Sequence, residues 1–462
     1  MSDQPPARVE RDGPLAAIVI DHPPPDPPAS ASRESIAERL EAIRERTLAL
    51  VEQLSDDALN AVHDPLMSPI VWDLGHIANF EELWLVQRVG GCSALRDELG
   101  GVYDAFTAPR PKRGQLPYLR AGECFAYMDA VRQRTLRCLE QVDLSGERER
   151  LLANGFVYEL ILRHEQQHTE TILQTLQIVD SGEYTSSADL HLPPARERPE
   201  GMVPVPGGVF ELGAPRDWFG YDNERPQHAR ELAPFWIDAA PVTNGEFTDF
   251  IQDGGYERAH WWSPEGWDWR ERASIRLPRY WQADGDGFAV RSFSRLRPID
   301  PQHPVCHVSW YEADAFARSR GKRLPTEAEW EKAASWDSSS RSKRPYPWGK
   351  GYDVCLANLD QLAFGTAAVG AYPDGVSPCG AHQMAGDVWE WTGSAFDPYD
   401  GFEAFPYREY SEVFFGGPFK VLRGGSWATQ PGAVTTAFRN WDYPDRRQIF
   451  AGFRCARDAG GD

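Results

Sequence analysis

The stretch Leu160 to Gln177, LILRHEQQHTETILQTLQ, carries the residue types best suited to chemistry. It contains no Gly or Pro and is rich in Leu, Ile and Gln, so it predicts a helix. His164 and His168 then lie one turn apart on one face, with Gln167 beside that face. Two neutral imidazoles at this spacing can hold one ion of Fe, Zn, Cu or Ni. The competing interpretation is a pair of solvated or core histidines.

The same residues spell His-Glu-x-x-His, the signature of zinc proteases in which Glu165 acts as the base. A zinc site of that kind needs a third ligand shortly downstream. Thr171 and Gln174 stand where the long form of the signature has Gly and a third His. Glu183 offers a carboxylate, but the surrounding SGEYTSS predicts a turn. A zinc protease therefore stays an alternative rather than the first interpretation.

A third histidine, His76, lies upstream in VWDLGHIANFEELW. This segment predicts a helix that opens at Ser68-Pro69, a cap followed by Pro at the first helical position. A lone His on such an apolar helix is typical of a core residue. Together with His164 and His168 it becomes a candidate third metal ligand.

Four predicted helices would position these histidines. The first begins near Ser35, where Ser35 and Glu38 form a capping box. The second carries His76, the third covers about 122–142, and the fourth, about 147–180, carries the histidine pair. We expect a four-helix bundle over residues 33–185, a fold that builds metal sites from side chains on facing helices. The Pro-rich residues 1–32 predict a disordered arm, to which we assign no function.

A basic segment, YDAFTAPRPKRGQLPYL, joins the second and third predicted helices and indicates a loop. Arg110, Lys112 and Arg113 give it positive charge in an acidic protein. A solvated basic loop is the ordinary interpretation. The functional interpretation is a clamp for carboxylates, because a guanidinium binds a carboxylate as a planar fork.

The chain changes character after a predicted linker at residues 186–200. Fifteen of the 17 Trp residues lie beyond residue 200, whereas predicted helices there are short: about 243–252, 310–320 and 326–335. Thr326 and Glu329 form a capping box for the last of these. Short β-runs such as GGVFELG and KVLRGGSW lie among turns and aromatic loops. We expect a second domain of α+β type over residues 201–462, with many loops.

Composition limits the classes of function. A net charge of -21 argues against a nucleic-acid surface or an anionic membrane as partner. The seven Cys form no Cys-x-x-Cys pair, which indicates neither a disulfide framework nor a cysteine zinc site. No apolar run is long enough for a signal-peptide core or a transmembrane helix. We expect a cytoplasmic monomer without nucleic-acid or membrane partners.

Beyond residue 200 the chain resembles the formylglycine-generating-enzyme (sulfatase-modifying factor) family, which has a C-type-lectin-like fold. The resemblance rests on eight strings in the family's order: GGVFELG, YDNERPQH, PVTNGEFTDFI, RLPTEAEWEKAA, YPWG, GDVWEWTGS, VLRGGSW and AGFRCARD. The first half resembles the DinB-like metal-binding bundle. The combination is similar to the iron-dependent sulfoxide synthases of ergothioneine biosynthesis. One departure stands out, because GGSWAT has Ala428 and Thr429 and the only late cysteine is Cys455. The fold is thus expected without the cysteine chemistry of formylglycine-generating enzymes.

The resemblance implies a non-haem Fe(II) held by His76, His164 and His168. It implies a reaction with O2 that joins the sulfur of γ-glutamyl-cysteine to the imidazole of trimethylhistidine (hercynine) and oxidises that sulfur to a sulfoxide. Tyr407 is the implied proton donor, although its order with Tyr410 stays open and Tyr399 is a third choice. Hercynine would be bound by Gln167, Tyr410, Asn440 and Trp441, and the dipeptide by Arg110, Arg113, Asp442 and Arg446.

The residues also allow other interpretations. Trp441 is typical of a packed core aromatic, and Asp442 with Arg446 is typical of a surface pair at i, i+4 spacing. Cysteine itself could replace γ-glutamyl-cysteine as thiol donor, as in some related synthases of the ergothioneine or ovothiol pathway. A zinc protease and a non-catalytic lectin-like binding module complete the alternatives.

Overall fold

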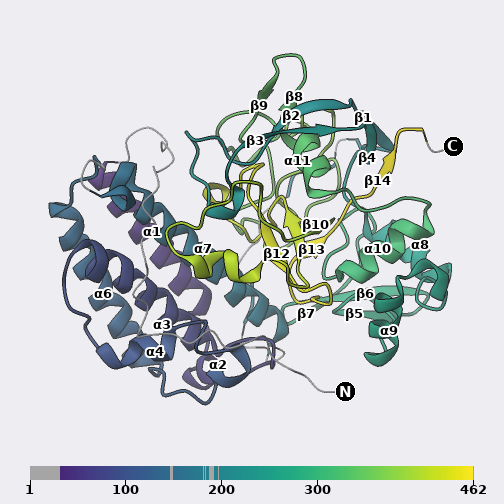
Figure 1. Ribbon diagram of the computed structural model, residues 1–462. Coiled ribbons are helices and arrows are strands. Elements are labelled where there is room, and N and C mark those ends of the chain that lie inside the picture. Colours follow the sequence, from purple (N-terminus) through teal and green to yellow (C-terminus); the bar gives the residue numbers. More distant parts are fainter. Residues whose placement is uncertain are drawn as a thin grey trace.

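The computed structural model describes residues 32–145, 149–179, 182, 184–186, 192–195 and 197–460. Residues 1–31 of the expected arm and Glu183 lie outside these ranges. Figure 1 shows a helical domain in purple and blue beside a loop-rich domain in teal, green and yellow. The predicted class, a helical bundle followed by a mixed α+β domain, is confirmed.

Four long helices form the bundle. They are α1 (Arg33–Val51), α3 (Ile70–Glu81) with its π-helical continuation η1 (Glu82–Val89), α6 (Ala121–Gln141) and α7 (Phe156–Ile178). Shorter turns connect them: α2 (Asp56–Asn60), η2 (Asp97–Leu99), α4 (Gly100–Tyr103), α5 (Arg110–Arg113) and η3 (Arg150–Gly155). The basic segment is therefore not a plain loop, since residues 110–113 form a helical turn.

Three helix starts differ from the sequence expectation. Ser32 rather than Ser35 caps α1, and its hydroxyl accepts the Ser35 N–H at 3.2 Å. Pro69 occupies the cap position of α3 and not its first helical position. The fourth helix begins later than expected, because Gly155 takes a left-handed backbone conformation (φ 77°) between η3 and α7.

The centre of the bundle holds a buried ionic cluster of Arg44, Glu81, Arg132 and Glu165. Glu165 Oε1 accepts from Arg44 Nε at 2.9 Å, and Glu165 Oε2 accepts from Arg132 Nη2 at 3.3 Å. Glu81 pairs with the same two guanidinium groups at 2.8 Å each. The charges balance, and every member has partners, as a buried network requires.

The second domain contains short strands in small sheets. They are β1 (Met202–Val205), β2 (Gly208–Leu212), β3 (His228–Leu232), β4 (Phe235–Asp238), β5 (Trp281–Asp284), β6 (Gly287–Ser292), β7 (Arg295–Pro298), β8 (Trp336–Asp337), β9 (Ser342–Lys343), β10 (Trp389–Ala395), β11 (Lys420–Arg423), β12 (Asn440–Asp442), β13 (Ala451–Gly452) and β14 (Ala456–Asp458). The sheet next to the site has the order β12-β11-β10-β13, with β10 and β13 parallel.

Its helices are short, as the sequence predicts: α8 (Asn244–Gln252), α9 (Pro264–Arg272), α10 (Trp310–Ser319) and α11 (Glu327–Ser335). Thr326 and Glu329 form the expected capping box of α11. Single turns lie in the loops: η4 (Asp222–Glu224), η5 (Ala259–Trp261), η6 (Arg408–Tyr410), η7 (Glu412–Phe414) and η8 (Pro431–Ala433). Among the residues that the structure describes, no helix is both long and apolar enough to cross a bilayer.

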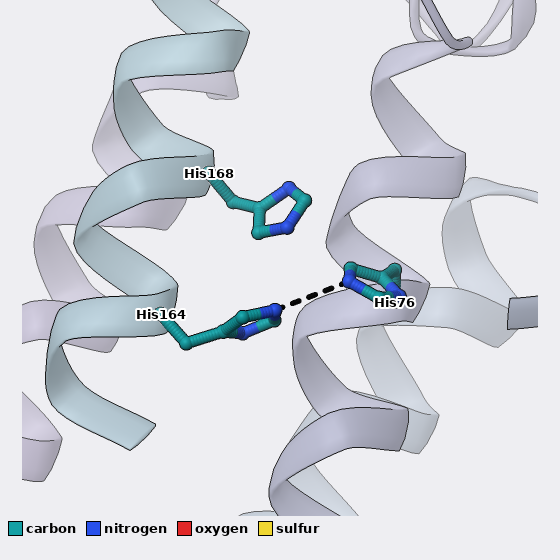
Figure 2. A group of neighbouring side chains, drawn as sticks. All are labelled: His76, His164 and His168. Atoms are coloured by element: carbon teal, nitrogen blue, oxygen red, sulfur yellow. Dashed lines mark hydrogen bonds between the residues drawn. The ribbon is translucent and has the colours of Figure 1, made fainter. Parts of the chain in front are cut away.

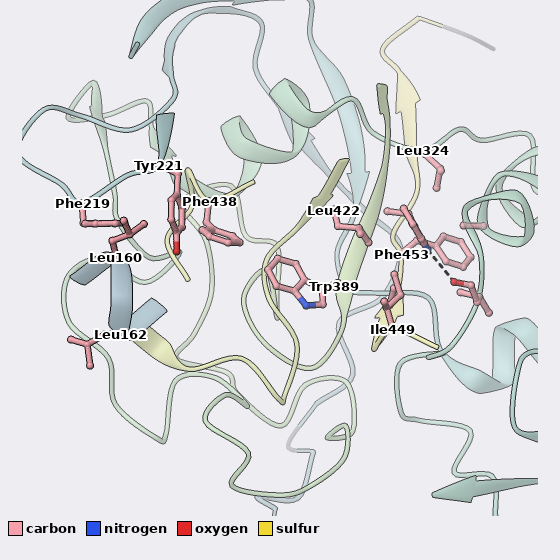
Figure 3. Packing of buried hydrophobic residues seen from close by; sticks show 14 of the residues in the cluster. Leu160, Leu162, Phe219, Tyr221, Leu324, Trp389, Leu422, Phe438, Ile449 and Phe453 are labelled. Carbon is pink, nitrogen blue, oxygen red and sulfur yellow. Dashed lines mark hydrogen bonds between the residues drawn. The ribbon is translucent and has the colours of Figure 1, made fainter. Parts of the chain in front are cut away.

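The two domains share apolar clusters, the larger of which runs from α7 into the second domain. Figure 3 shows Leu160 of α7 near Phe219 and Tyr221, with Trp389 and Phe453 further along the same cluster. A polar contact lies within this apolar interface: the buried Glu170 of α7 accepts the Trp389 indole N–H at 2.6 Å. Glu170 also accepts the hydroxyls of Thr429 at 2.8 Å and Ser426 at 3.3 Å. Helix α7 of the bundle therefore packs directly against the second domain.

Replacing Glu165 with Ala should lower the free energy of unfolding by about 3–5 kcal/mol, because Arg44 and Arg132 would then share the single carboxylate of Glu81 and one buried positive charge would stay unbalanced. Chemical denaturation measures this change. The control is Glu98→Ala, which removes an exposed partner of Arg96 and should leave stability nearly unchanged. Equal stability of Glu165→Ala and the wild type would contradict the assigned role of the cluster.

Candidate metal and substrate site

The structure brings His76 of α3 together with His164 and His168 of α7. One ligand nitrogen from each lies within 4.8 Å of the others, and the Nε2 atoms of His76 and His164 are 3.1 Å apart. Figure 2 shows the three rings converging from two facing helices. Within the described part of the chain, His76, His164 and His168 form a group of side chains whose spacing suits a metal ion.

Hydrogen bonds on the far side of two rings fix their orientation. His76 Nδ1 donates to the Tyr103 carbonyl at 2.6 Å, and His168 Nδ1 lies 3.2 Å from Asp73 Oδ1. Both contacts leave Nε2 as the atom with a free lone pair, which is the usual arrangement around a metal-bound His. Burial, followed by the charge of His168, holds the pKa values of His76 and His164 well below their usual value. These imidazoles are therefore neutral, as ligands must be.

The donor set fits a divalent transition metal. Metal–nitrogen bonds of about 2.1 Å at right angles place two ligand nitrogens about 3.0 Å apart, close to the spacing of the two Nε2 atoms. Three histidines from one side leave the remaining positions to small molecules, and imidazole suits Fe as well as Zn, Cu and Ni. The geometry by itself identifies a divalent transition metal as the class of ion and does not select one element.

Glu165 takes no part in this site. On a helix, adjacent residues point about 100° apart, so Glu165 faces the ionic cluster while His164 and His168 face the metal site. Its two carboxylate oxygens are occupied by Arg44, Arg132 and Thr47. Because the required base points away, this geometry disfavours the zinc-protease alternative.

The second domain provides an aromatic wall opposite the histidines. Gln167 Nε2 donates to the Tyr410 hydroxyl at 3.1 Å, across the domain interface. The Phe80 ring stacks on His164 with 3.9 Å between centroids, and Tyr407 lies 6.2 Å from Phe80. Tyr410 is thus bonded to Gln167, a neighbour of His164 and His168 on α7, and Tyr407 lies near Phe80, which stacks on His164.

The two tyrosines differ in their hydroxyl contacts. Tyr410 accepts from Gln167, whereas the Tyr407 hydroxyl has no hydrogen-bond partner within the described part of the chain. Burial holds both pKa values well above the usual value, so both hydroxyls keep their protons. Tyr399 lies elsewhere, because its hydroxyl donates to Glu327 at 2.8 Å.

Strand β12 carries Asn440, Trp441 and Asp442 towards the same region. The Trp441 ring stacks on Phe396 at 4.0 Å and meets Tyr410 edge-on at 6.1 Å. Trp441 therefore both packs in the domain and borders the tyrosine wall. The Asn440 side-chain oxygen accepts the Trp441 N–H at 2.8 Å, which holds the amide beside that ring.

Charged residues from both domains surround Asp442. Arg446 lies 3.5 Å from its carboxylate, and burial raises the Asp442 pKa while the cations of Arg446 and then Arg110 oppose that rise. Arg110 comes from the bundle, where its guanidinium donates to the Leu66 carbonyl at 3.1 Å. Arg446 therefore pairs with Asp442 directly, whereas Arg110 acts on the Asp442 pKa only through its charge.

Arg113 differs from the other members of the predicted clamp. It is only 6% exposed, and its guanidinium donates to Ser68 Oγ and to the Ala108 carbonyl, both at 2.8 Å. It also lies 3.7 Å above the Trp72 ring, which in turn stacks on His76 at 5.1 Å. In this structure Arg113 supports the side of the bundle that holds His76.

Sequence reasoning did not single out Asp73, Trp72, Phe80 or Tyr103, all of which contact the histidines. Asp73 carries a detectable signal, because it stands three residues before His76 on the same helix and so shares its face. Tyr103 acts through its backbone carbonyl, for which side-chain patterns give no signal.

Loss of any one of His76, His164 and His168 to Ala should abolish tight metal binding while the bundle stays folded, since its apolar cluster and its ionic cluster do not depend on these side chains. Asp73→Ala should weaken metal affinity by about 10- to 100-fold, because His168 would lose its orienting partner. Calorimetric titration with Fe(II) under argon measures both effects. Asp64→Ala, at a bundle carboxylate that pairs with Arg279, is the control. Unchanged affinity in all three histidine variants would contradict the site.

Comparison with known proteins agrees with this two-domain site. Residues 39–172 match the DinB superfamily, and residues 188–459 match the sulfatase-modifying factor enzyme 1-like domain. A formylglycine-generating enzyme from Thermomonospora curvata is 32% identical over 308 residues, covering 57% of this chain and 95% of that protein.

Two further relatives cover both domains. A hercynine oxygenase from Mycolicibacterium smegmatis is 44% identical over 440 residues, covering 92% of this chain and 99% of the relative. One from Mycobacterium tuberculosis is 45% identical over 432 residues, with the same coverage. Since the similarity spans the bundle, the second domain and the interface between them, the chain belongs to the hercynine oxygenase family and is an oxidoreductase.

Proposed function

We propose that this chain uses iron(II) and O2 to join the sulfur of γ-glutamyl-cysteine to the imidazole carbon between the two ring nitrogens of hercynine. The product is γ-glutamyl-hercynylcysteine sulfoxide, an intermediate of ergothioneine biosynthesis. The proposal also includes a monomeric enzyme in the cytoplasm.

The reaction balances with one O2. Formation of the carbon–sulfur bond from a thiol S–H and a ring C–H removes two electrons and two protons. Oxidation of the sulfur to the sulfoxide removes two more electrons. Together these four electrons reduce O2, so that one oxygen atom enters the sulfoxide and the other leaves as water.

One observation carries the proposal: three imidazoles from the bundle, with Gln167 beside them, lie next to tyrosine side chains of the other domain. Iron(II) held by this trio supplies redox chemistry with O2 and acidifies a thiol that binds to it. Neither domain alone contains both the histidines and the tyrosines, and binding sites commonly form between domains.

The chain's own residues have separable roles in this proposal. Gln167 and Tyr410 already form a polar pair beside His164, and they are suited to orient a substrate imidazole. Trp441 borders the same wall, where an aromatic face attracts a trimethylammonium group. Tyr407 keeps its proton, and its hydroxyl has no hydrogen-bond partner among the described residues, so it is suited to donate a proton during the reaction.

The arrangement of charge favours the dipeptide as thiol donor. γ-Glutamyl-cysteine has two separate carboxylates and a distant ammonium, whereas cysteine has one of each close to the sulfur. Arg110 and Arg446 can bind carboxylates and Asp442 can bind an ammonium, in a cluster built from both domains. Arg113 is engaged by Ser68 and by backbone carbonyls, so its direct role requires a change of partners. Cysteine remains the second candidate donor.

The direct test is reconstitution with Fe(II) under argon, addition of hercynine with either thiol, exposure to O2, and mass analysis of the products. The dipeptide should give the sulfoxide more efficiently than cysteine does. A preference for cysteine would show that cysteine, and not γ-glutamyl-cysteine, is the thiol donor. Peptide cleavage with bound zinc would contradict the whole proposal.

Tyr407→Phe should reduce sulfoxide formation by on the order of a hundredfold or more, since loss of a positioned general acid has effects of that size. Oxidation of the thiol alone to a sulfinic acid should rise. The ratio of the two products by mass analysis checks this expectation. Tyr399→Phe is the control, because its hydroxyl bonds to Glu327 away from the site. If Tyr410→Phe changes the ratio and Tyr407→Phe does not, the two tyrosines exchange roles.

Arg110→Ala and Asp442→Ala should each raise the KM for γ-glutamyl-cysteine by on the order of ten- to a hundredfold, since each removes a charged hydrogen-bonding partner. The KM for hercynine should change much less. Lys112→Ala is a matched control, because Lys112 lies in the same basic turn but is exposed. Wild-type dipeptide kinetics in both variants would show that these residues are ordinary surface charges.

A further inference from the structure

One buried carboxyl group holds both ends of the segment that carries the two tyrosines. Asp222 Oδ2 accepts the backbone N–H of Phe405 at 3.2 Å, and Asp222 Oδ1 accepts the hydroxyl of Ser411. Tyr407 and Tyr410 lie between these two attachment points. The carboxyl therefore closes the segment 405–411 into a loop across its base.

The attachment is itself fixed. Asp222 is 4% exposed and belongs to η4, and the next residue, Asn223, donates its side-chain N–H to Ser411 Oγ at 2.9 Å. Arg439 donates to the Asn223 carbonyl at 2.6 Å and is held in turn by Glu327. The anchor thus belongs to the rigid interior of the second domain and not to the loop that it holds.

The residue before Asp222 contacts one of the two tyrosines, Tyr410, directly. The Tyr221 ring stacks on Tyr410 with 4.3 Å between centroids and 17° between planes. Tyr221 also belongs to the core shared with α7, near Leu160 in Figure 3. Residues 221 and 222 therefore set both the ends and the middle of the tyrosine segment relative to the bundle.

Such an anchor matters because the segment has little regular structure of its own. Between Phe405 and Ser411 it contains a single 3-10 turn, Arg408–Tyr410. A loop without fixed ends samples many conformations, and a displacement of about 1 Å at a reacting group can cost about a hundredfold in rate.

We propose that Asp222 is a positioning residue that holds Tyr407 and Tyr410 against the three-histidine site by tying Phe405 and Ser411 to one carboxyl group. Its effect on the reaction rests on the proposed function, whereas its effect on the tyrosine segment does not. Asp222 touches no substrate and acts only through the segment.

The test compares Asp222→Ala and Ser411→Ala with Glu312→Ala in the full chain. Glu312 is the control: it is also a buried carboxylate that accepts one backbone N–H, from Ser309 at 2.7 Å, and the hydroxyls of Ser309 and Tyr256, and it pairs with Arg447 at 3.3 Å. It lies on α10, and within the described part of the chain none of these partners belongs to the tyrosine segment. Its loss should therefore cost stability without disturbing Tyr407 or Tyr410.

Hydrogen exchange of the metal-free proteins gives the first readout. Asp222→Ala should speed amide exchange in 404–411 at least tenfold while α7 keeps wild-type protection, and Ser411→Ala should do so less strongly. Glu312→Ala should leave exchange in that segment unchanged. Wild-type protection of 404–411 in Asp222→Ala, or in Ser411→Ala if the Asp222 variant does not fold, would overturn the anchor.

The ratio of sulfoxide to sulfinic acid gives the second readout. Asp222→Ala should shift the ratio towards sulfinic acid, as Tyr407→Phe does, whereas Glu312→Ala should keep the wild-type ratio. An equal ratio in Asp222→Ala and Glu312→Ala would overturn the positioning role. If the wild-type protein makes no sulfoxide, the proposed function fails, and the exchange result still decides whether Asp222 holds the segment.

Discussion

The packing of α7 between two domains is the constraint on which the rest of the structure depends. One face of this helix supplies His164 and His168, and Glu165 on another face completes the ionic centre of the bundle. Gln167 and Glu170 reach into the second domain, where they meet Tyr410 and Trp389. A rotation of α7 would therefore break the metal site, the bundle core and the domain contact together, so that each of them fixes the others.

This constraint also explains the chemistry that the site can support. Burial holds the pKa values of His76 and His164 below their usual value and those of Tyr407 and Tyr410 above theirs, so these imidazoles stay neutral and these hydroxyls keep their protons at neutral pH. Thr429, which stands where the resemblance had raised the question of a missing cysteine, donates its hydroxyl to Glu170 instead. Thr429 of the lectin-like domain thus helps to hold α7 of the bundle against this domain. In the proposed function, the chemistry then depends on residues from both domains.

Local patterns predicted the parts of the site that lie on one element. The His164–His168 spacing follows from the helical period, and the two domain types follow from the change in composition near residue 200. Local patterns failed at Arg113. Its charge suggested a guanidinium free to bind a substrate carboxylate, whereas Ser68 and Trp72 hold this guanidinium inside the bundle. Asp222 gave no signal at all, since its partners Phe405 and Ser411 are more than 180 residues away. Contacts between distant segments depend on tertiary packing, which one sequence without structure does not specify.

We propose that the reaction takes place between the three histidines of the bundle and the tyrosines of the second domain. The most direct measurement is an anaerobic crystal structure with Fe(II) and hercynine, with the metal located by anomalous scattering. We expect iron bound to the Nε2 atoms of His76, His164 and His168, with the substrate imidazole between them and Gln167, Tyr407 and Tyr410. Hercynine bound away from this interface, or iron held by other residues, would contradict it.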